Sequence, residues 1–183
     1  MGLEKIIRDM LLQEGAADVG FAKAPDGPFG ENSYAISIVV RLSDAVVDEI
    51  DGEPTHTYFH HYRTVNAFID RLVLKTGIIL QNHGYKYIPI GASQSINING
   101  WNYNGRYSHK KAASLAHLGG IGKNSLFLHK DYGARVRLGT LFTNCEFETK
   151  QEKYHSPCTE CDRCVKACPS GAIKGMLWRP GTE

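Results

Sequence analysis

Apolar residues near the start of the chain recur at helical spacing, and an alternating pattern follows. Between Leu3 and Leu11, apolar residues return every three or four positions, which predicts a helix that Gly15 ends. Residues 33–42 alternate instead, with Tyr34 and Leu42 at the two ends of one apolar face. This period of two predicts a strand that is half-buried or central in a sheet.

The middle of the chain carries the longest helical pattern, after a polar stretch at residues 44–57. From Tyr58 to Ile79 the apolar residues form one stripe, and Gly84 follows as a residue suited to ending a helix. The next apolar segment, residues 85–90, predicts a short strand. Its extent is limited by a proline, which lacks the N–H that a sheet ladder needs.

Residues 97–107 interrupt this pattern with asparagine, glycine and aromatic residues in close succession. Such a composition predicts either a surface loop or a loop whose amides and rings contact a flat, polar ligand. Ser108 then provides an N-cap for a short helix that reaches Leu118.

The glycine-rich segment 119–124 lacks the features of a standard nucleotide-binding loop. A Walker A loop needs glycine where this chain has His117, and serine or threonine where it has Asn124. A dinucleotide fingerprint needs a strand before the glycines, whereas a helix is predicted there. We therefore predict a helix-to-strand turn, followed by a hairpin with strands at residues 126–128 and 136–142.

Helices and strands mix without a regular βαβ rhythm, so the pattern predicts an α+β fold. The chain has 183 residues, of which 42% are hydrophobic and 22% charged, as in an ordinary globular protein. Its net charge of +2 does not favour DNA binding. No apolar run approaches the roughly 18–20 residues that cross a bilayer, and no signal-peptide core is apparent. We expect a cytoplasmic protein without membrane attachment.

Four of the five cysteines lie within 11 residues, in the pattern Cys-x2-Cys-x2-Cys-x3-Cys-Pro. They are Cys158, Cys161, Cys164 and Cys168. The two-residue gaps let three thiolates converge on one cubane from a single loop, and the wider gap and the proline lead the chain away. In a cytoplasmic chain, such a run predicts metal ligation, here of a 4Fe-4S cluster, rather than a disulfide framework.

Alternatives to a single complete cluster stay open. Structural zinc also uses four thiolates, but its ligands usually form two pairs separated by a longer insert. In two-cluster ferredoxins the fourth cysteine of such a run binds the other cluster. Cys168 therefore belongs either to the same cluster or to a second one, and an intact chain would hold one cluster or two. We interpret Cys145, outside the run, as a small buried hydrophobic residue.

Two further groups of polar residues are weaker candidates for chemistry. His56 and His60 stand one helical turn apart, with His61 beside them, but no third metal ligand is apparent and a solvated helix start is preferred. Arg135 and Arg137 share one face of a strand, for which a solvated sheet edge is preferred over anion binding.

Longer motifs resemble one family. The run Lys111-Ala-Ala-Ser-Leu-Ala-His-Leu-Gly-Gly-Ile-Gly-Lys-Asn124, the segment after it that ends Leu-Gly-Thr-Leu-Phe-Thr-Asn144, and the cysteine run together resemble the epoxyqueuosine reductases. The cobalamin-dependent reductive dehalogenases share a similar core. The resemblance is close over about residues 108–175. It implies a nitroreductase-like or cobalamin-processing-like domain over residues 1–150 and an incomplete ferredoxin-like 4Fe-4S module over residues 151–183.

The resemblance also implies a second cofactor site. In the family a ferredoxin-like cluster passes electrons to a corrinoid, and cobalamin is therefore a candidate cofactor here, with flavin as the alternative. The segments that match the corrinoid pocket contain Gly122, Lys123, Asn124, Leu138 and Gly139. The family's acidic proton donor after the strand at 85–90 has no counterpart, because Gly-Ala-Ser-Gln follows that strand. We assign no catalytic residue from the sequence.

We expect an oxidoreductase that passes electrons from a 4Fe-4S cluster to a corrinoid or another bound acceptor. The resemblance implies a ferredoxin or flavodoxin as redox partner, and a small molecule or modified nucleoside as substrate. The alternative is a ferredoxin-like electron-transfer module without catalysis of its own, which serves a partner enzyme.

Overall fold

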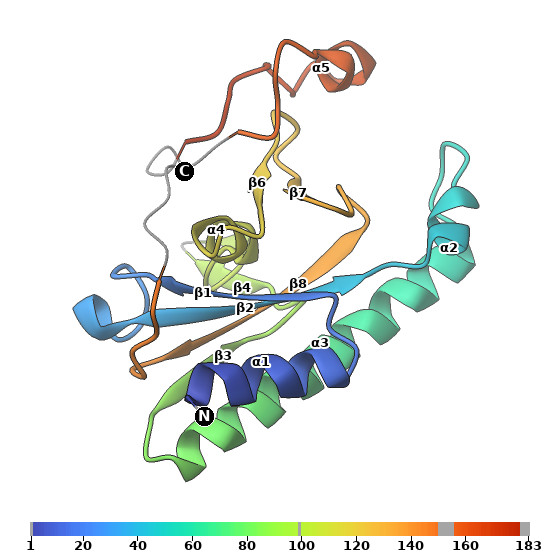
Figure 1. The fold of residues 1–183 in the computed structure, drawn as a ribbon. Coiled ribbons are helices and arrows are strands. Elements are labelled where there is room, and N and C mark those ends of the chain that lie inside the picture. The colour runs from blue at the N-terminus through green and yellow to red at the C-terminus, as the bar shows by residue number, and fades with distance from the viewer. Residues whose placement is uncertain (1, 99, 150–155, 180–183) are drawn as a thin grey trace.

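The computed structural model describes residues 2–98, 100–149 and 156–179, and is built around one main sheet (Figure 1). All pairings in this sheet are antiparallel, and its strands lie in the order β1–β2–β8–β3. The strands are β1 (Asp18–Lys23), β2 (Tyr34–Arg41), β3 (Tyr87–Ile90) and β8 (Val136–Thr143). The predicted α+β class is confirmed.

Helices cover both faces of the sheet (Figure 1). On one face lie α1 (Leu3–Gln13) and α3 (His56–Asn82). On the other lies α4 (His109–Leu115), with a small hairpin formed by β6 (Gly119–Ile121) and β7 (Phe127–His129) beside it. The turn of this hairpin contacts the C-terminal part of the chain.

Strand β2 is an inner strand, one of the two alternatives that the alternating pattern predicted, and it is buried on both faces because helices cover both sides of the sheet. Ile36 and Ile38 belong to the larger core together with Ile69 of α3. Val39 points the other way and packs with Ala113 of α4. The two helical layers are thus held by alternate residues of one strand.

The long helix α3 begins and ends where local chemistry favours it. The Thr55 hydroxyl accepts a hydrogen bond from the Tyr58 N–H at 3.0 Å, which caps the first turn. Beyond the last turn, Gly84 has φ of +83°, a left-handed conformation that costs glycine little. The predicted end at Gly84 is confirmed, and the helix starts two residues before the apolar stripe.

The predicted hairpin of residues 126–128 with 136–142 is wrong. Strand β7 pairs with β6, so that Ile121 lies opposite Phe127 and the segment predicted as a glycine turn contains a strand. Strand β8 pairs with β2 and β3 instead, where Leu141 and Phe142 are fully buried. The long-range pairing of β8 with β2 and β3 is favoured because it buries more apolar surface than a local hairpin would.

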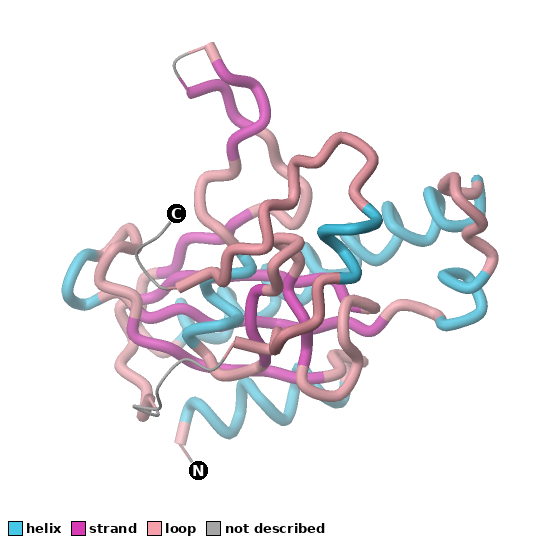
Figure 2. The backbone as a smooth tube through the Cα atoms, turned by 90° about the horizontal axis from the view of Figure 1, so that it is seen from above, coloured by secondary structure: helices cyan, strands magenta, loops and turns pink. Residues whose placement is uncertain are grey.

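Other short elements also escaped the sequence pattern. The predicted loop at 97–107 contains β4 (Ile96–Ile98) and β5 (Trp101–Asn104), which form a hairpin that stands away from the rest of the chain in Figure 2. Residue 99 of that segment lies outside the described residues. Ligand contact by the segment 97–107 stays a prediction. Strand β1, the 3-10 helix Gly30–Asn32 and α2 (Asp44–Asp48) were not predicted.

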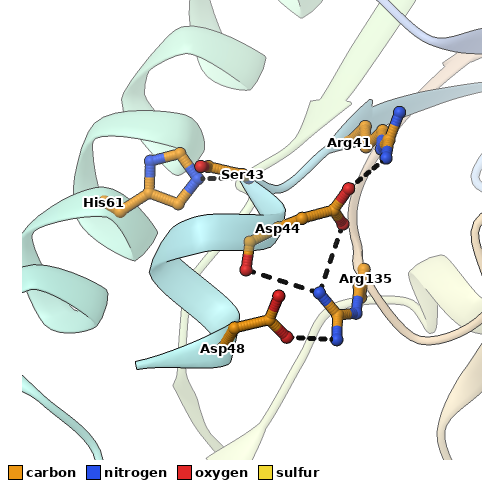
Figure 3. A network of polar contacts seen from close by, with 6 residues as sticks. All are labelled: Arg41, Ser43, Asp44, Asp48, His61 and Arg135. Carbon is orange, nitrogen blue, oxygen red and sulfur yellow. Dashed lines mark hydrogen bonds and ion pairs between the residues drawn. The ribbon is translucent and has the colours of Figure 1, made fainter. Parts of the chain in front are cut away.

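Arg135 does not lie on a free sheet edge but anchors α2 (Figure 3). Its guanidinium contacts Asp44 Oδ1 at 3.2 Å and Asp48 Oδ1 at 2.6 Å. These ion pairs are partly exposed, so each contributes little by itself. At the start of α2, the Ser43 N–H donates to His61 Nε2 at 3.1 Å. His56 and His60 are exposed on the first turns of α3, as expected of a solvated helix start.

The C-terminal part resumes after a gap in the description. The predicted domain boundary at 150–151 lies outside the described residues. From Ser156 onward the chain forms loops and the short helix α5 (Arg163–Ala167), which lies beyond the β6–β7 hairpin in Figure 1. No helix in the described ranges has the length and apolar character needed to cross a bilayer.

Close packing of α3 on the sheet depends on a glycine in β8. A Cβ atom built on Gly139 would collide with Ile69 Cγ2 and would lie 3.4 Å from Val73 Cγ2. Both side chains are buried in the larger core and have no room to withdraw. Gly139 therefore sets the distance between β8 and α3.

We expect Gly139→Ala to lower the free energy of unfolding by about 1–3 kcal/mol, because the extra methyl group overpacks the α3 interface. Denaturant titration under reducing conditions would measure this. Gly105→Ala is the matched control, since its added Cβ would meet only the Tyr107 carbonyl oxygen at 3.5 Å. Equal effects of the two substitutions would show that close α3 packing is not the cause.

Candidate functional site

The four cysteines of the run lie together in the segment 156–179, hereafter the cysteine segment. Cys161 is exposed and the other three are half-buried, and none is joined in a disulfide. Cys164 lies in α5, and Cys158 and Cys161 lie on the irregular backbone before that helix. All four thiols are therefore free and accessible for metal ligation.

The turn that links β6 to β7 meets the cysteine segment. Its backbone is closed by a hydrogen bond from the Ser125 N–H to the Gly122 carbonyl oxygen at 2.9 Å. The Asn124 carboxamide oxygen accepts the Leu126 N–H at 3.1 Å, which fixes the turn further. A Cβ on Gly122 would lie 2.9 Å from Asn124 Oδ1 and 3.4 Å from Cys158 Sγ. Glycine at this position lets the turn approach the cysteine closely.

Lys123 contacts the cysteine segment through both its backbone and its side chain. Its N–H donates to Cys158 Sγ at 3.3 Å, and its ammonium group contacts Asp162 Oδ1 at 2.7 Å. The hydrogen bond with this carboxylate raises the pKa of Lys123 and lowers the pKa of Asp162. The two groups are thus a stable ion pair at neutral pH.

Cys168 lies in a different environment, next to the turn that follows α5. Backbone hydrogen bonding from Ile173, the Ser170 hydroxyl and further N–H groups of that turn lower the pKa of the Cys168 thiol to about 7. The Ser170 hydroxyl oxygen lies 3.6 Å from Cys168 Sγ. Hydrogen bonds of this kind favour the thiolate, the form that binds metal.

The cysteine segment therefore fits an iron–sulfur cluster. Four accessible thiols lie within 11 residues, and N–H groups already point at the sulfurs of Cys158 and Cys168. N–H···S hydrogen bonds are a recurrent way in which proteins stabilise cluster ligands. Cys145, by contrast, is buried beside the larger core, and burial raises the pKa of its thiol. Its prediction as a small buried hydrophobic residue is confirmed.

A pocket of about 300 Å³ lies at the start of β8, and we call it the β8 pocket. Its walls come from α3, from α4, from the β6–β7 turn and from β8 itself. The wall residues that matter here are Tyr58, His109, Lys110, Leu126, Arg137 and Leu138. The pocket is small for a cofactor site, and cationic and aromatic side chains are among the residues that line it.

His109 is a polar residue in the wall of the β8 pocket. Its Nε2 lies 3.1 Å from the Gly91 carbonyl oxygen, which can only accept, so Nε2 carries the proton. Nδ1 then accepts from the Thr140 hydroxyl at 2.8 Å. Burial lowers the pKa of His109, so the ring is neutral at pH 7. It is therefore a positioned, uncharged group.

Tyr62 is a candidate functional residue that the sequence pattern assigned to the apolar stripe of the long helix. The Arg137 guanidinium lies over its ring, 4.2 Å from the centroid. Its hydroxyl lies 3.1 Å from Ser93 Oγ. The hydrogen bond with Ser93 lowers the pKa of Tyr62, and the Arg137 charge acts in the same direction. No local signal marks it, because Arg137 reaches it from a strand 75 residues later in the chain.

Arg137 was predicted to lie on a solvated sheet edge, but it packs against α3 instead. Besides its contact with Tyr62, its Nε donates to Asn66 Oδ1 at 3.0 Å, and Asn66 is buried in α3. Charge-assisted hydrogen bonds of this kind hold a guanidinium in one orientation. Arg137 thus joins α3 to the β8 pocket.

The five residues predicted to line a corrinoid pocket do not gather in one place. Gly122 and Lys123 border the cysteine segment, and Asn124 shapes the same turn. Leu138 lines the β8 pocket. Gly139 faces α3 on the opposite side of the sheet. Their corrinoid contacts stay a prediction.

One further group of metal-ligand types is already satisfied within the protein. Asp18, His129 and Asp131 lie close together. His129 Nδ1 accepts the Asp131 N–H at 3.1 Å, so Nε2 carries the proton and donates to Asp18 Oδ2 at 3.2 Å. The ammonium group of Lys130 lies 3.0 Å from the same oxygen. Both ring nitrogens are used, which favours a structural ion-pair cluster over a metal site.

Comparison with known proteins agrees with this site. Residues 154–174 match the family described as 4Fe-4S binding domain, which confirms the predicted cluster-binding segment. An epoxyqueuosine reductase of Listeria monocytogenes is 39% identical over 71 residues, or 39% of this chain and 18% of that protein. The corresponding enzyme of Lactococcus garvieae is 43% identical over 63 residues, or 34% of this chain and 18% of that protein.

Solved structures extend the similarity to nearly the whole chain. An epoxyqueuosine reductase from Streptococcus thermophilus superimposes with a TM-score of 0.64 at 23% identity, covering 96% of this chain and 54% of that one. A catabolic reductive dehalogenase in complex with 3-bromo-4-hydroxybenzoic acid has a TM-score of 0.71 at 16% identity, covering 91% of this chain and 25% of that one. The chain therefore spans about half the length of the solved epoxyqueuosine reductase. The predicted resemblance to the epoxyqueuosine reductases is confirmed, in sequence over 71 residues and in fold over nearly the whole chain.

Proposed function

We propose that the protein is an iron–sulfur oxidoreductase in which a 4Fe-4S cluster delivers electrons to an acceptor at the β8 pocket. The observation that carries this proposal is the position of the turn between β6 and β7. At one end, the Lys123 N–H contacts the sulfur of Cys158. A few residues later, Leu126 and Phe127 line the β8 pocket. One short segment thus borders both the electron source and the acceptor site.

Cys158, Cys161 and Cys164 would hold one cluster, and Cys168 would complete it or hold a second. When bound, the cluster supplies electrons one at a time. The chain's own contribution is to hold the thiolates, through the N–H of Lys123 and the turn around Ser170. The external source would be a one-electron carrier such as ferredoxin or flavodoxin.

A corrinoid, as in the resemblance, is the acceptor we propose first, with flavin second. Leu138 and the turn carrying Gly122, Lys123 and Asn124 would meet it. The volume of about 300 Å³ lies at the lower limit for enclosing a drug-sized ligand, so only one face of a larger macrocycle would enter. A reduced corrinoid would supply a strong two-electron donor to a substrate.

Tyr62 is the proposed proton donor. A two-electron reduction that breaks a bond to oxygen or halogen needs a proton for the product, and no carboxylate follows β3 to provide it. When the Tyr62 O–H bond breaks, the proton goes to the substrate and a phenolate stays behind. The Arg137 guanidinium over the ring stabilises that phenolate until solvent returns the proton.

The substrate we propose is a modified nucleoside or another small molecule. A related epoxyqueuosine reductase was solved with an epoxyqueuosine-modified tRNA stem loop; it has a TM-score of 0.67 and 17% identity, and the match covers 96% of this chain and 54% of that one. The neutral His109 and the cation of Arg137 both line the β8 pocket and would contact a polar substrate there.

A non-catalytic electron-transfer module is the alternative function. The absence of a carboxylate after β3 favours it, because the proton donor that the resemblance implies is missing at that point. The two functions differ in whether anything binds at the β8 pocket.

The cluster itself gives the first test. Protein made anaerobically should contain iron and acid-labile sulfide, and should absorb broadly at about 400 nm. Cys161→Ala should lose most of both, because it removes a ligand. Cys145→Ala, which changes a buried cysteine outside the run, should keep them. Zinc without sulfide in the unaltered protein would contradict the proposal.

Binding of an acceptor distinguishes the proposed oxidoreductase from a non-catalytic electron-transfer module. Hydroxocobalamin or FMN should bind saturably and raise the melting temperature, since a ligand at 100 times its Kd stabilises the folded state by about 2.7 kcal/mol. Leu138→Trp should weaken binding by filling the β8 pocket, whereas Leu12→Trp, on the exposed side of α1, should not. If neither compound binds, the result supports the alternative function, a non-catalytic electron-transfer module.

Removing the Tyr62 hydroxyl tests the proton donor. Tyr62→Phe should slow single-turnover reduction of an epoxyqueuosine-containing stem loop by about 10²–10⁴-fold, with cluster content unchanged. Tyr85→Phe removes the hydroxyl of an exposed tyrosine that does not line the β8 pocket and is the control. The rate should fall as pH rises through the pKa of Tyr62, which lies below its usual value of 10, because only the protonated form donates. A rate unchanged in Tyr62→Phe would exclude this role.

A further inference from the structure

We propose that Lys123 positions the cluster and raises its reduction potential, so that the β6–β7 turn controls how readily the cluster accepts electrons. This inference rests on the proposed cluster. Lys123 is treated as a positioning residue, since its side chain contacts the segment that carries the cysteines and not a substrate.

The contacts of Lys123 span the first half of the cysteine run. Its backbone N–H donates to Cys158 Sγ at 3.3 Å. Its ammonium nitrogen lies 3.4 Å from the Cys161 carbonyl oxygen and 2.7 Å from Asp162 Oδ1. One residue therefore holds two of the cysteines and the N-cap residue of α5.

The low exposure of this side chain distinguishes it from exposed surface lysines such as Lys5. The Lys123 side chain is only 10% exposed, whereas Asp162 is 49% exposed. In the Lys5–Asp9 pair, by comparison, the two side chains are 63% and 50% exposed. A lysine is rarely buried without a partner. Its charge is also less screened by water and salt than an exposed charge would be.

A largely covered positive charge beside the cluster changes its redox equilibrium. Reduction adds one negative charge to a cluster that already carries four thiolates, so a nearby ammonium group stabilises the reduced form more than the oxidised form. The reduction potential rises as a result. Asp162 acts in the opposite direction, because its carboxylate opposes the added electron.

The same turn also contacts the β8 pocket from its other side. The ammonium group of Lys110, which lines that pocket, donates to the Ser125 carbonyl oxygen at 2.7 Å. The backbone between Lys123 and Ser125 therefore links the cluster environment to the acceptor site.

Potentiometric titration of the reconstituted protein, followed by EPR or absorbance, tests the inference. Lys123→Gln keeps the backbone N–H and removes the charge. It should lower the reduced-to-oxidised ratio at fixed potential about tenfold, a shift of about 59 mV to more negative values for one electron. Asp162→Asn should shift the potential the other way. Lys174→Gln removes an exposed charge in the same segment and should shift it much less.

Opposite shifts distinguish an electrostatic role from a purely structural one, which would move both variants in the same direction. An unchanged potential in Lys123→Gln, or shifts of equal sign in both variants, overturns the proposal. If Lys123→Gln binds no cluster, Lys123→Arg should restore iron and sulfide, and Asp162→Asn still measures the charge effect. Failure of Lys123→Arg to restore them removes the positioning role. A wild-type protein without iron and sulfide would instead contradict the proposed function itself.

Discussion

The antiparallel pairing of β2 with β8 is the interaction on which the rest of the structure depends. It joins residues about 100 positions apart in the chain, from Tyr34 opposite Thr143 to Arg41 opposite Val136. Because side chains alternate along β8, this register sends Gly139 toward α3 and Leu138 toward the layer of α4. A shift by one residue would exchange the two faces and remove both the α3 packing and the β8 pocket.

The same pairing places Arg137, which lines the β8 pocket, against polar residues of α3. Arg137 lies two residues before Gly139 and therefore on the same face of β8, where it meets Tyr62 and Asn66 of α3. Close approach of α3 at Gly139 brings those side chains within reach. A packing constraint in the core thus positions a tyrosine and an arginine with complementary chemistry.

The turn between β6 and β7 is the second organising feature. It is short, closed by its own hydrogen bonds, and contacts the cysteine segment through Lys123. Since β7 pairs with β6 and not with β8, the turn points away from the main sheet and toward α5 (Figure 1). Through Lys110 and Leu126 the same turn also borders the β8 pocket, so one short segment contacts both sites.

The sequence by itself determined those features that depend on residues close together in the chain. The spacing of four cysteines identified the 4Fe-4S segment, since ligand geometry is written in consecutive residues. Periodicity likewise identified α1, α3 and β2, because each buries a continuous stripe or face.

Tertiary structure decided what depended on distant partners. It paired β8 with β2 rather than with β7, brought Arg137 over Tyr62, and placed Lys123 against Cys158. None of these contacts has a local signal, because each joins residues that are between 35 and about 100 positions apart in the chain. Only the burial of a shared core makes such pairings favourable enough to outweigh the entropy of closing those loops.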